Sequence, residues 1–318
     1  MYEWNDSNEA LLNQHIFRVL PDEIKVDKRY LRHGLEGAII DMQQHLHGAT
    51  MQHVNRGEFL KTKLYLPPID QQKRIAAILD KAEELRRLRR QSIEHLDVLS
   101  RSIFIEMFGD PVTNPKGWDR VMFSDLLLKI ESGHSPNCLD RPVIEDKEWG
   151  VLKLGAITSC KYNPLENKAL PPNEKPHLEL EVKVGDLLFT RKNTYELVAA
   201  CALVLTTIPN LLLPDLIFRF RLKLDAPMNS SFLHQLLINP AKRREIQKLA
   251  SGSSSSMPNI SKAKLQSILI EVPPLSLQQE FAQRIEAIES LKAKHRESLT
   301  HLDTLFASLQ HRAFRGEL

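Results

Sequence analysis

The sequence predicts an α+β fold in which mixed α/β modules alternate with two long helices that pair as an antiparallel coiled coil. Three observations support this fold class. A module recurs at an offset of 206 residues, two long segments carry a seven-residue apolar pattern, and a proline pair precedes each of them. Self-similarity at so long an interval indicates duplication of a whole module rather than a solenoid repeat. Two copies of one module usually perform one task twice.

The repeat aligns without a gap from Leu66 and from Val272 onward. Both copies contain a proline pair, a glutamine-rich helix start and a His-Leu-Asp triplet. The aligned pairs include Pro67 and Pro273, Leu85 and Leu291, Ser92 and Ser298, Leu99 and Leu305, and Phe108 and Phe314. We therefore expect the two copies to share one structure.

Composition sets only broad limits. A chain of 318 residues is long enough for two ordinary domains, and its net charge of +3 is compatible with a nucleic-acid partner without requiring one. The three cysteines are widely spaced without a C-x-x-C pair, which argues against a disulfide framework or a zinc knuckle. Because neither a signal peptide nor a membrane-length apolar run is evident, we expect a soluble, cytoplasmic protein with no membrane partner.

Prolines and glycines divide the chain into four segments. Each proline pair stands where a strand should end and a helix begin, because proline does not fit a helix interior. Gly109 and Gly316 mark the far ends of the two helices. The expected segments are an α/β remnant at 1–66, a long helix at 67–110, a complete α/β module at 111–273 and a second long helix at 274–318.

Both long helices carry a heptad pattern. In the first, Ile75, Ala82, Leu96 and Ile103 share one heptad position, and Ile78, Leu85 and Leu99 share another. In the second, Phe281, Ile288, Leu302 and Leu309 match the first set, and Leu291 and Leu305 match the second. Such a period makes an apolar seam that a partner helix buries, and each helix would span roughly 60 Å. Either stretch alone would also fit an amphipathic helix on a globular core, but their matching register favours an antiparallel pair.

The seam is interrupted at the same place in both helices. Arg89 and Ser92 interrupt the first helix, and their repeat equivalents His295 and Ser298 interrupt the second. In an antiparallel pair these layers would meet and form a polar stripe that fixes the register. A structure with Arg89 far from His295 would contradict this hypothesis.

The module before each helix repeats more loosely. The pentapeptide His-Ile-Phe-Arg-Val at 15–19 resembles Leu-Ile-Phe-Arg-Phe at 216–220. A helix, a polar loop and a last strand should follow each pentapeptide. The expected helices lie near 27–46 and 230–250, and the expected strands contain Met51 and Met257. Only sixteen residues precede Phe17, so we expect the first module to lack its front half.

No catalytic constellation stands out. The chain has neither a G-x-x-x-x-G-K-[ST] phosphate loop nor the [ND]-P-P-aromatic motif of adenine methyltransferases. His45 and His47 lie two residues apart in a helical stretch, hence on different faces, and fit solvated histidines better than a metal pair. The acidic string at 179–183 fits an exposed alternating strand better than a nuclease motif. We therefore expect no catalytic residue, metal or cofactor in this chain.

Candidate nucleic-acid contacts follow an apolar strand. Thr190, Arg191, Lys192 and Asn193 place two cations and a carboxamide on a loop. Arginine can bind guanine bidentately, asparagine can bind adenine, and lysine most often contacts phosphate. A solvated strand end is the alternative interpretation.

A serine-rich loop supplies the second candidate site. Its small donors and adaptable backbone suit phosphate or base edges, although a flexible linker would have the same composition. The candidate residues here are Ser253, Ser254, Ser255 and Asn259. Weaker candidates are Lys153, His134 and Ser135.

The motifs of the second module resemble those of the specificity subunits of type I restriction-modification systems. ESGHSPN at 131–137 resembles the family's Gly-x-x-Pro loop, and VGDLLFTRKN at 184–193 its Gly-Asp strand. WGVLKLGAI at 149–157 resembles its tryptophan strand, with Ala156 where aspartate is usual. The serine-rich loop, strand, proline pair and Gln-Gln helix start resemble its closing signature. The likeness covers residues 15–318.

The resemblance implies a non-catalytic subunit in which target recognition domains alternate with conserved helices. Each recognition domain would read a half-site of a bipartite double-stranded DNA target, and the coiled coil would set the distance between the halves. Methyltransferase subunits with S-adenosylmethionine would dock on the helices, and restriction subunits with ATP and Mg²⁺ would join them. Residues 1–66 would be the C-terminal remnant of a truncated first recognition domain, and 111–273 the complete second one.

Three interpretations remain open from the sequence. The first is a DNA specificity subunit. The second is a half-subunit that pairs with a second copy of itself, or a silent or fragmentary cassette. The third is a coiled-coil scaffold without DNA recognition.

Overall fold

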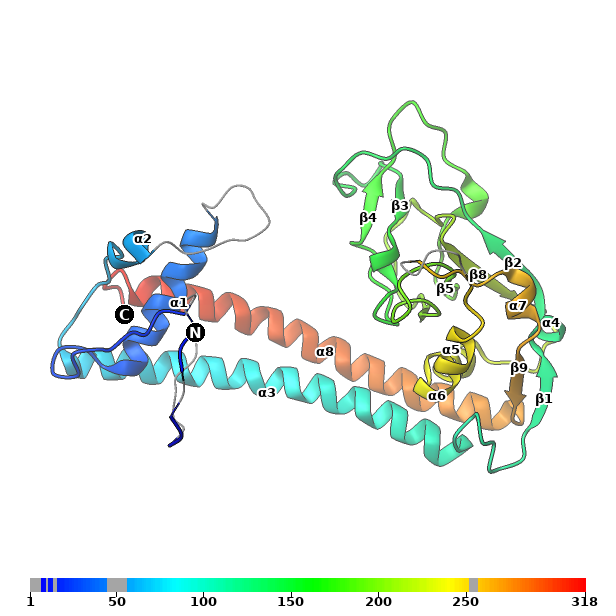
Figure 1. Ribbon diagram of the computed structural model, residues 1–318, viewed down its shortest axis with the longest axis horizontal. Coiled ribbons are helices and arrows are strands. Elements are labelled where there is room, and N and C mark those ends of the chain that lie inside the picture. Colours follow the sequence, from blue (N-terminus) through cyan, green and yellow to red (C-terminus); the bar gives the residue numbers. More distant parts are fainter. Residues whose placement is uncertain (1–6, 10, 14–15, 45–55, 252–256) are drawn as a thin grey trace. The chain divides into compact units, whose positions relative to one another are not determined.

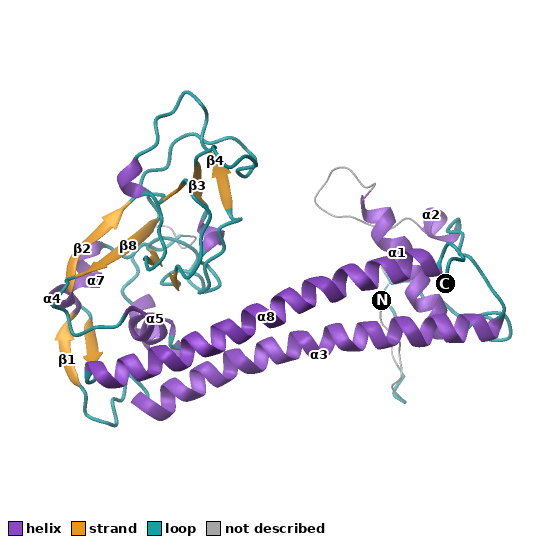
Figure 2. Cartoon of the chain, turned by 180° about the vertical axis from the view of Figure 1, so that it is seen from behind, coloured by secondary structure: helices purple, strands orange, loops and turns teal. Residues whose placement is uncertain are grey.

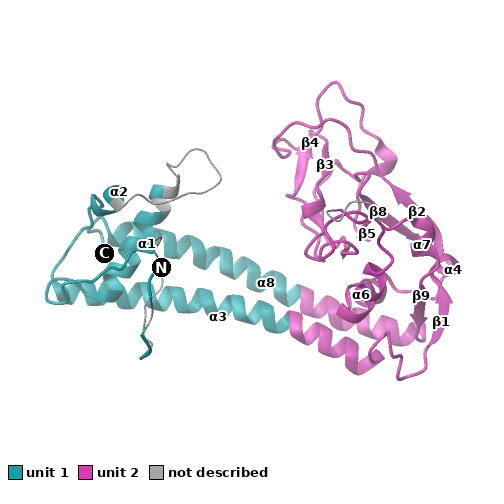
Figure 3. Cartoon of the chain, viewed as in Figure 1, with its two compact units in different colours: residues 1–96, 290–318 teal, residues 97–289 magenta. Residues whose placement is uncertain are grey.

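The computed structural model describes residues 7–9, 11–13, 16–44, 56–251 and 257–318, and it comprises two compact units (Figure 1). Unit 1 contains residues 1–96 and 290–318, and unit 2 contains residues 97–289. The division cuts both long helices, α3 (Ile69–Phe108) and α8 (Leu275–Ala313). In the part of the chain that the structure describes, all strands lie in unit 2 (Figures 2 and 3).

Unit 1 packs two short helices against one end of the helix pair. These helices are α1 (Lys28–Gln44) and α2 (Arg56–Leu60). The core gathers the fully buried ring of Tyr30 with Ile75, Leu79 and Phe306. The Tyr30 hydroxyl donates to the carbonyl of Tyr65 at 2.6 Å. Burial, with a smaller contribution from Tyr65, raises the pKa of Tyr30 to about 12.

The long helices pack together and run antiparallel, as the sequence predicts. In unit 1, Arg86 donates to the Asp303 carboxylate at 2.6 Å, and three residues later on α3 Arg89 contacts His295, which precedes Asp303 on α8. In unit 2, the rings of Phe104 and Phe281 lie 5.7 Å apart. The mixed α+β fold class with two paired long helices is therefore confirmed.

Only one of the two expected heptad positions lies in the buried seam. The first set is buried or half-buried, with Ile75, Ala82, Phe281 and Ile288 at most 8% exposed and Leu96, Ile103, Leu302 and Leu309 half-buried. The second set, by contrast, is 41–49% exposed: Ile78, Leu85, Leu99, Leu291 and Leu305.

The seam uses the residue that follows each member of the second set. Leu79 and Phe306 are buried where Ile78 and Leu305 were expected. A heptad alternates steps of three and four residues. We expected the seam to step three residues from Ile75 to Ile78, whereas it steps four residues to Leu79. The assignment of the second set to the interface was therefore wrong.

The expected polar layer forms between the helices. Arg89 Nη1 lies 2.6 Å from His295 Nδ1, and since arginine can only donate, the imidazole nitrogen accepts. Ser92, Ser298 and Arg89 line a groove of about 350 Å³. Its apolar lining comes from Leu85, Leu88 and Leu302. We refer to this groove between α3 and α8 as the coil groove.

Unit 2 contains three small sheets, two of which share a core. The four-stranded antiparallel sheet has the order β2-β8-β5-β6, the three-stranded sheet β4-β3-β7, and the two-stranded sheet β1-β9. The strands are β1 (Asp119–Met122), β2 (Leu127–Ser132), β3 (Gly150–Leu152), β4 (Asn167–Ala169), β5 (Leu187–Thr190), β6 (Cys201–Leu203), β7 (Leu211–Leu212), β8 (Ile217–Leu222) and β9 (Leu269–Val272). Leu188, Leu211 and Ile217 join the first two sheets in one apolar cluster.

Helices and short turns cover the sheets of unit 2. They are α4 (Phe123–Leu126), η1 (Leu154–Ala156), η2 (Leu178–Leu180), α5 (Ser230–Ile238), α6 (Pro240–Gln247) and α7 (Lys262–Gln266). The helix expected near 230–250 is interrupted between α5 and α6. Asn239 ends α5, and its side chain caps α6 by accepting from the amide of Ala241 at 3.0 Å, with Pro240 in the first turn. The strand expected at 179–183 is instead the turn η2 and its continuation.

A buried ionic network lies at the centre of the four-stranded sheet. Arg219 on β8 is fully buried and pairs with Glu131 on β2 at 2.5 Å and with Asp186 before β5 at 3.0 Å. It also donates to the carbonyls of Glu179 and Glu181 at 2.8 and 2.7 Å. The network therefore ties β2, β5, β8 and the η2 segment together.

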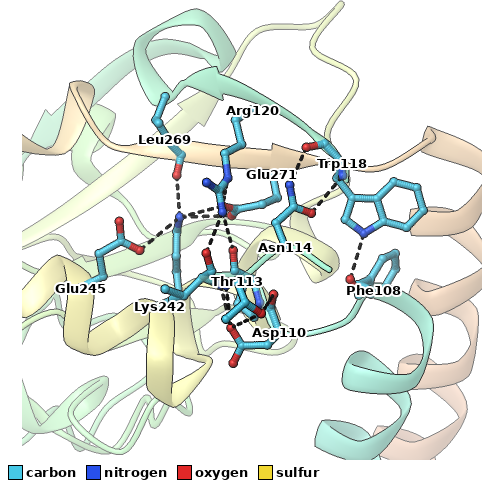
Figure 4. A network of polar contacts seen from close by, with 12 residues as sticks. Phe108, Asp110, Thr113, Asn114, Trp118, Arg120, Lys242, Glu245, Leu269 and Glu271 are labelled. Atoms are coloured by element: carbon cyan, nitrogen blue, oxygen red, sulfur yellow. Dashed lines mark hydrogen bonds and ion pairs between the residues drawn. The ribbon is translucent and has the colours of Figure 1, made fainter. Parts of the chain in front are cut away.

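A second network fastens the end of α3 to the sheet that follows it (Figure 4). Trp118 donates to the Phe108 carbonyl at 2.9 Å, and Arg120 on β1 pairs with Glu271 on β9 at 3.0 Å. Lys242 on α6 is 2% exposed and bonds Glu271 and the Leu269 carbonyl. Lys242 is thus a buried anchor that joins α6 to β9.

Two general features complete the fold. Cys138, Cys160 and Cys201 are free thiols, and burial raises the pKa of Cys201 well above its usual value. Among the described residues, no helix combines the length and apolar character that crossing a membrane requires. His45, His47 and Met51 lie outside the described residues.

Candidate nucleic-acid interface

One short segment of unit 2 brings together two of the predicted candidate loops. Residues 213–218 accept hydrogen bonds on one side from the amides of Gly133 and His134, at 3.2 and 3.1 Å. On the other side the amide of Arg191 donates to the Leu216 carbonyl at 3.1 Å. A Cβ atom on Gly133 would lie 1.7 Å from the Leu213 carbonyl oxygen, so only glycine allows this close approach.

The strand after the serine-rich loop joins the same site. Asn259 forms bridges with both Lys192 and Ser251, and the amide of Ile260 donates to the Arg191 carbonyl at 2.8 Å. The two ends of the loop are therefore clamped beside Arg191. The candidates Ser253, Ser254 and Ser255 lie outside the described residues.

The side chain of Arg191 is held in place by two neighbours. Its guanidinium carbon lies 5.1 Å from the centroid of the Phe218 ring, and its Nε donates to Asn259 Oδ1 at 3.1 Å. The Lys262 ammonium lies 5.6 Å from the same ring. A cation held over an aromatic face is favoured by the ring quadrupole. We call Arg191, Lys192, Phe218, Asn259 and Lys262 the Arg191 patch.

Two of the predicted contact residues serve the fold instead. Thr190 is fully buried, and its hydroxyl interacts with the backbone of Leu197 and Ala200. Asn193 is 7% exposed, and its side-chain oxygen accepts from the amide of Thr194 at 2.9 Å. The motif was expected on a loop after the strand. Its first residue, Thr190, is instead the last residue of β5 and still lies in the core.

The weaker candidates already have protein partners. Lys153 pairs with Glu166 at 2.9 Å just beyond β3, whose parallel partner β7 leads into the segment 213–218. Ser135 donates to the Asp215 carboxylate. The exposed ring of His134 lies 5.4 Å from that of His177. His134 and Ser135 bond directly to the segment 213–218, as the amide of Arg191 does.

Two members of the Arg191 patch escaped prediction from the sequence. Phe218 belongs to the Leu-Ile-Phe-Arg-Phe repeat, which indicated only a strand. Lys262 follows Ile260 by two residues and opens α7, so that its amphipathic side chain reaches Phe218. Phe218 lies between the cations Arg191 and Lys262 in the structure. The sequence does not reveal this arrangement, because it does not show that β8 and α7 are neighbours.

The possibility of a metal site arises at one cluster in unit 1. The ligand atoms of His33, Asp80 and Glu83 lie within 4.8 Å of one another. Arg32 already pairs with Asp80 at 3.0 Å and with Glu83 at 2.9 Å, and Arg29 also pairs with Asp80. These guanidinium groups neutralise the carboxylates, so the cluster fastens α1 to α3 rather than binding a cation.

Comparison with known proteins identifies the family. The profile described as "Type I restriction modification DNA specificity domain" matches residues 2–97 and 189–301, which is more than half of the chain. The chain belongs to this family. The resemblance drawn from the motifs is thereby confirmed, whereas truncation of the first recognition domain stays a prediction.

The relatives of this specificity chain are longer than it is. It is 32% identical over 176 residues to the EcoEI specificity subunit of Escherichia coli, covering 55% of this chain and 30% of that subunit. It is 23% identical over 289 residues to the EcoKI specificity subunit of E. coli strain K12, covering 85% of this chain and 61% of that subunit. The chain thus spans less than two thirds of both relatives.

Solved structures show the same fold at low identity. The type I restriction-modification S subunit of M. genitalium aligns with a TM-score of 0.56 and 11% identity, over 92% of this chain and 74% of that one. A chain from a structure of type I R-M complex assembly and conformational transition aligns with a TM-score of 0.52 and 18% identity, over 93% and 73%.

Proposed function

We propose that this chain is a non-catalytic DNA specificity subunit of a cytoplasmic type I restriction-modification complex, and that unit 2 reads one half-site of a bipartite duplex through the Arg191 patch. The observation that carries the proposal is the convergence of two cations from separate segments, Arg191 and Lys262, on the Phe218 ring, with Asn259 bonded to Arg191 and bridged to Lys192. Arginine and asparagine suit base edges, and lysine suits phosphate.

The patch is preorganised for contact with a base. Stacking on Phe218 and the bond from Nε to Asn259 fix the guanidinium of Arg191 before DNA arrives. Its two terminal nitrogens have no hydrogen bond within the described residues and are the pair that would donate to guanine. Fixing a long side chain in advance lowers the entropic cost of binding. Lys192 and Lys262 would contact the flanking phosphates.

Loss of Arg191 should weaken and relax DNA recognition. We expect Arg191→Ala to cost about 1–3 kcal/mol of binding to the preferred duplex, selected from a randomised pool, and to broaden selectivity at one base pair. Lys262→Ala should weaken binding to all duplexes alike. It should also reduce the slope of log affinity against log salt concentration by about 1. Fluorescence anisotropy across a salt series measures both.

The matched control for these variants is Lys223→Ala. Lys223 is an exposed lysine just beyond the other end of β8, five residues and therefore about 17 Å from Phe218. It should leave affinity and selectivity nearly unchanged. If Arg191→Ala combined with Lys192→Ala left duplex binding and its salt slope unaltered, the chain would be a coiled-coil scaffold instead.

The coil groove is our candidate docking site for the methyltransferase subunit. Leu85 and Leu88 are exposed beside it, and Ile78, Leu291 and Leu305 share the heptad position of Leu85 and its repeat equivalent. Apolar side chains repeated on the outside of a helix pair suit a further helix. Restriction subunits would join that complex. S-adenosylmethionine, ATP and Mg²⁺ would belong to these partners.

Charges placed in the coil groove should abolish that docking. Leu85→Glu combined with Leu88→Glu should reduce methyltransferase binding at least tenfold without unfolding the chain, because both side chains are exposed. Val98→Glu combined with Ile105→Glu makes the same apolar-to-acidic change at exposed positions about 140–160° around α3 from Leu85 and should have little effect. Calorimetry with the purified partner distinguishes them, and equal losses would contradict this docking site.

A further inference from the structure

The backbone of Asn259 is held between two other segments of unit 2. Its amide and carbonyl exchange two hydrogen bonds with Ser251, at 3.1 and 3.0 Å. On its other side it bridges to Lys192, and the amide of the next residue, Ile260, donates to the Arg191 carbonyl at 2.8 Å. Ile260 is fully buried, so the segment that carries Asn259 is anchored in the core. The backbones of Asn259 and Arg191 therefore have a defined position relative to each other.

The contact between these two side chains identifies the atoms of the Asn259 amide. Arg191 Nε donates to Asn259 Oδ1 at 3.1 Å, and since arginine can only donate, the atom that faces it must be the oxygen. The amide nitrogen, Nδ2, then points elsewhere. In the part of the chain that the structure describes, Nδ2 has no hydrogen-bond partner, and the residue is only half-buried. Both of its N–H groups are therefore available to a ligand.

The bond to Arg191 removes the usual adenine contact of an asparagine. A bidentate contact with adenine requires the amide to accept from N6 while it donates to N7. The Asn259 oxygen keeps a second lone pair, but the guanidinium charge beside it opposes the approach of another N–H donor. While Arg191 is in place, Asn259 thus offers DNA donors without an effective acceptor.

The donors of the two side chains lie close enough to contact neighbouring base pairs. Covalent geometry keeps Asn259 Nδ2 within about 8 Å of either terminal nitrogen of Arg191. Base pairs rise about 3.4 Å per step, so the two groups span at most about two steps. On their major-groove edges guanine and thymine present acceptors and no donor. Cytosine presents only a donor, and adenine presents a donor beside its acceptor.

We propose that Arg191 and Asn259 form a donor-only pair that selects guanine at one base pair and guanine or thymine at a second, within about two steps. Arg191 sets the second preference by occupying the Asn259 oxygen. This inference rests on the proposed function, because it requires the Arg191 patch to contact base edges. It goes further by naming the class of base and by making one residue determine the preference of another.

Selection from a randomised duplex pool with the full chain tests the pair. Asn259→Ala locates the second base pair as the position where it removes the wild-type preference. There the wild-type chain should favour guanine or thymine over adenine or cytosine by about two- to tenfold, the effect of one net hydrogen bond. Fluorescence anisotropy with four duplexes that differ only at this position measures the preference.

Arg191→Met separates the donor-only pair from independent readout by each residue. Methionine keeps an apolar side chain over Phe218 but frees the Asn259 oxygen. The preference at the second base pair should therefore change to adenine, by at least about fivefold. Lys192→Met is the matched control, because it removes a neighbouring cation and leaves the bond between Arg191 and Asn259. It should weaken binding without changing the preferred base.

Three results would overturn the donor-only pair. They are a wild-type preference for adenine or cytosine at the second base pair, an unchanged preference there in Arg191→Met, and an Asn259→Ala variant that keeps every wild-type preference. The proposed function is judged separately at the first base pair, where Arg191→Met should remove the preference for guanine in every case. If neither variant altered any base preference, both proposals would fail.

Discussion

Replacing Arg219 by methionine should lower the free energy of unfolding of unit 2 by about 3–5 kcal/mol. The guanidinium is fully buried, and its removal leaves Asp186, itself 3% exposed, without one of its two arginine partners. The carbonyls of Glu179 and Glu181 also lose their donor. Breaking a buried ion pair on one side costs far more than the pair contributes, because the remaining charge stays desolvated.

The repeat provides a matched control for this substitution. Arg18→Met makes the same change in the same pentapeptide, but Arg18 is exposed, so the expected cost is within about 0.5 kcal/mol. Urea unfolding followed by far-ultraviolet circular dichroism reports on both units, and the fluorescence of Trp118 and Trp149, in a Trp4→Phe background, reports on unit 2. Similar stabilities of the two variants would show that the Arg219 network does not stabilise the four-stranded sheet as described here.

Acid should weaken unit 2 through the same network. Burial alone would raise the pKa of Glu131, but hydrogen bonds from Lys129 and Arg219 and the charges of Arg219 and Arg221 outweigh burial and hold the pKa at about 2. A folded-state pKa below the usual value stabilises the fold at neutral pH. That contribution is complete above a pH of about 4.5 and is lost as the pH falls toward about 2. The loss should be smaller in Arg219→Met.

Much of the architecture was predictable because duplication and periodicity can be recognised in the sequence without knowing any tertiary contact. The proline pairs located the starts of α3 and α8, and the repeat predicted that Arg89 would meet His295. The heptad pattern failed at the second position because two adjacent residues, Ile78 and Leu79, are both apolar and either would fit the pattern. Which of the two is buried depends on the partner helix.

The candidate site was predictable only where a motif and a surface coincide. Arg191 and Asn259 were identified from their loops, but Thr190 and Asn193 belong to the same motif and are buried. Lys242, although it is a lysine in a charged stretch of α6, is an internal anchor for Glu271. Burial of a polar residue depends on distant strands supplying its hydrogen bonds, and one short motif does not encode those partners.

Two neighbouring residues of α8 test the corrected heptad. Phe306→Ala should destabilise unit 1 by about 3–5 kcal/mol, because its ring is 9% exposed and packs with Ile75 and Leu79 beneath the guanidinium of Arg86, 4.3 Å from the ring centroid. Leu305→Ala should cost well under about 1 kcal/mol, since that side chain is 49% exposed.

Hydrogen exchange of the α8 amides in unit 1 measures both effects on one helix. Alanine favours helix as much as leucine does or more, so a change in helix propensity does not explain a loss at either position. The seam alternates steps of three and four residues, and only the residue that follows a step of four from Leu302 faces α3. A larger loss for Leu305→Ala than for Phe306→Ala would mean that the helices pair one residue out of the register described here.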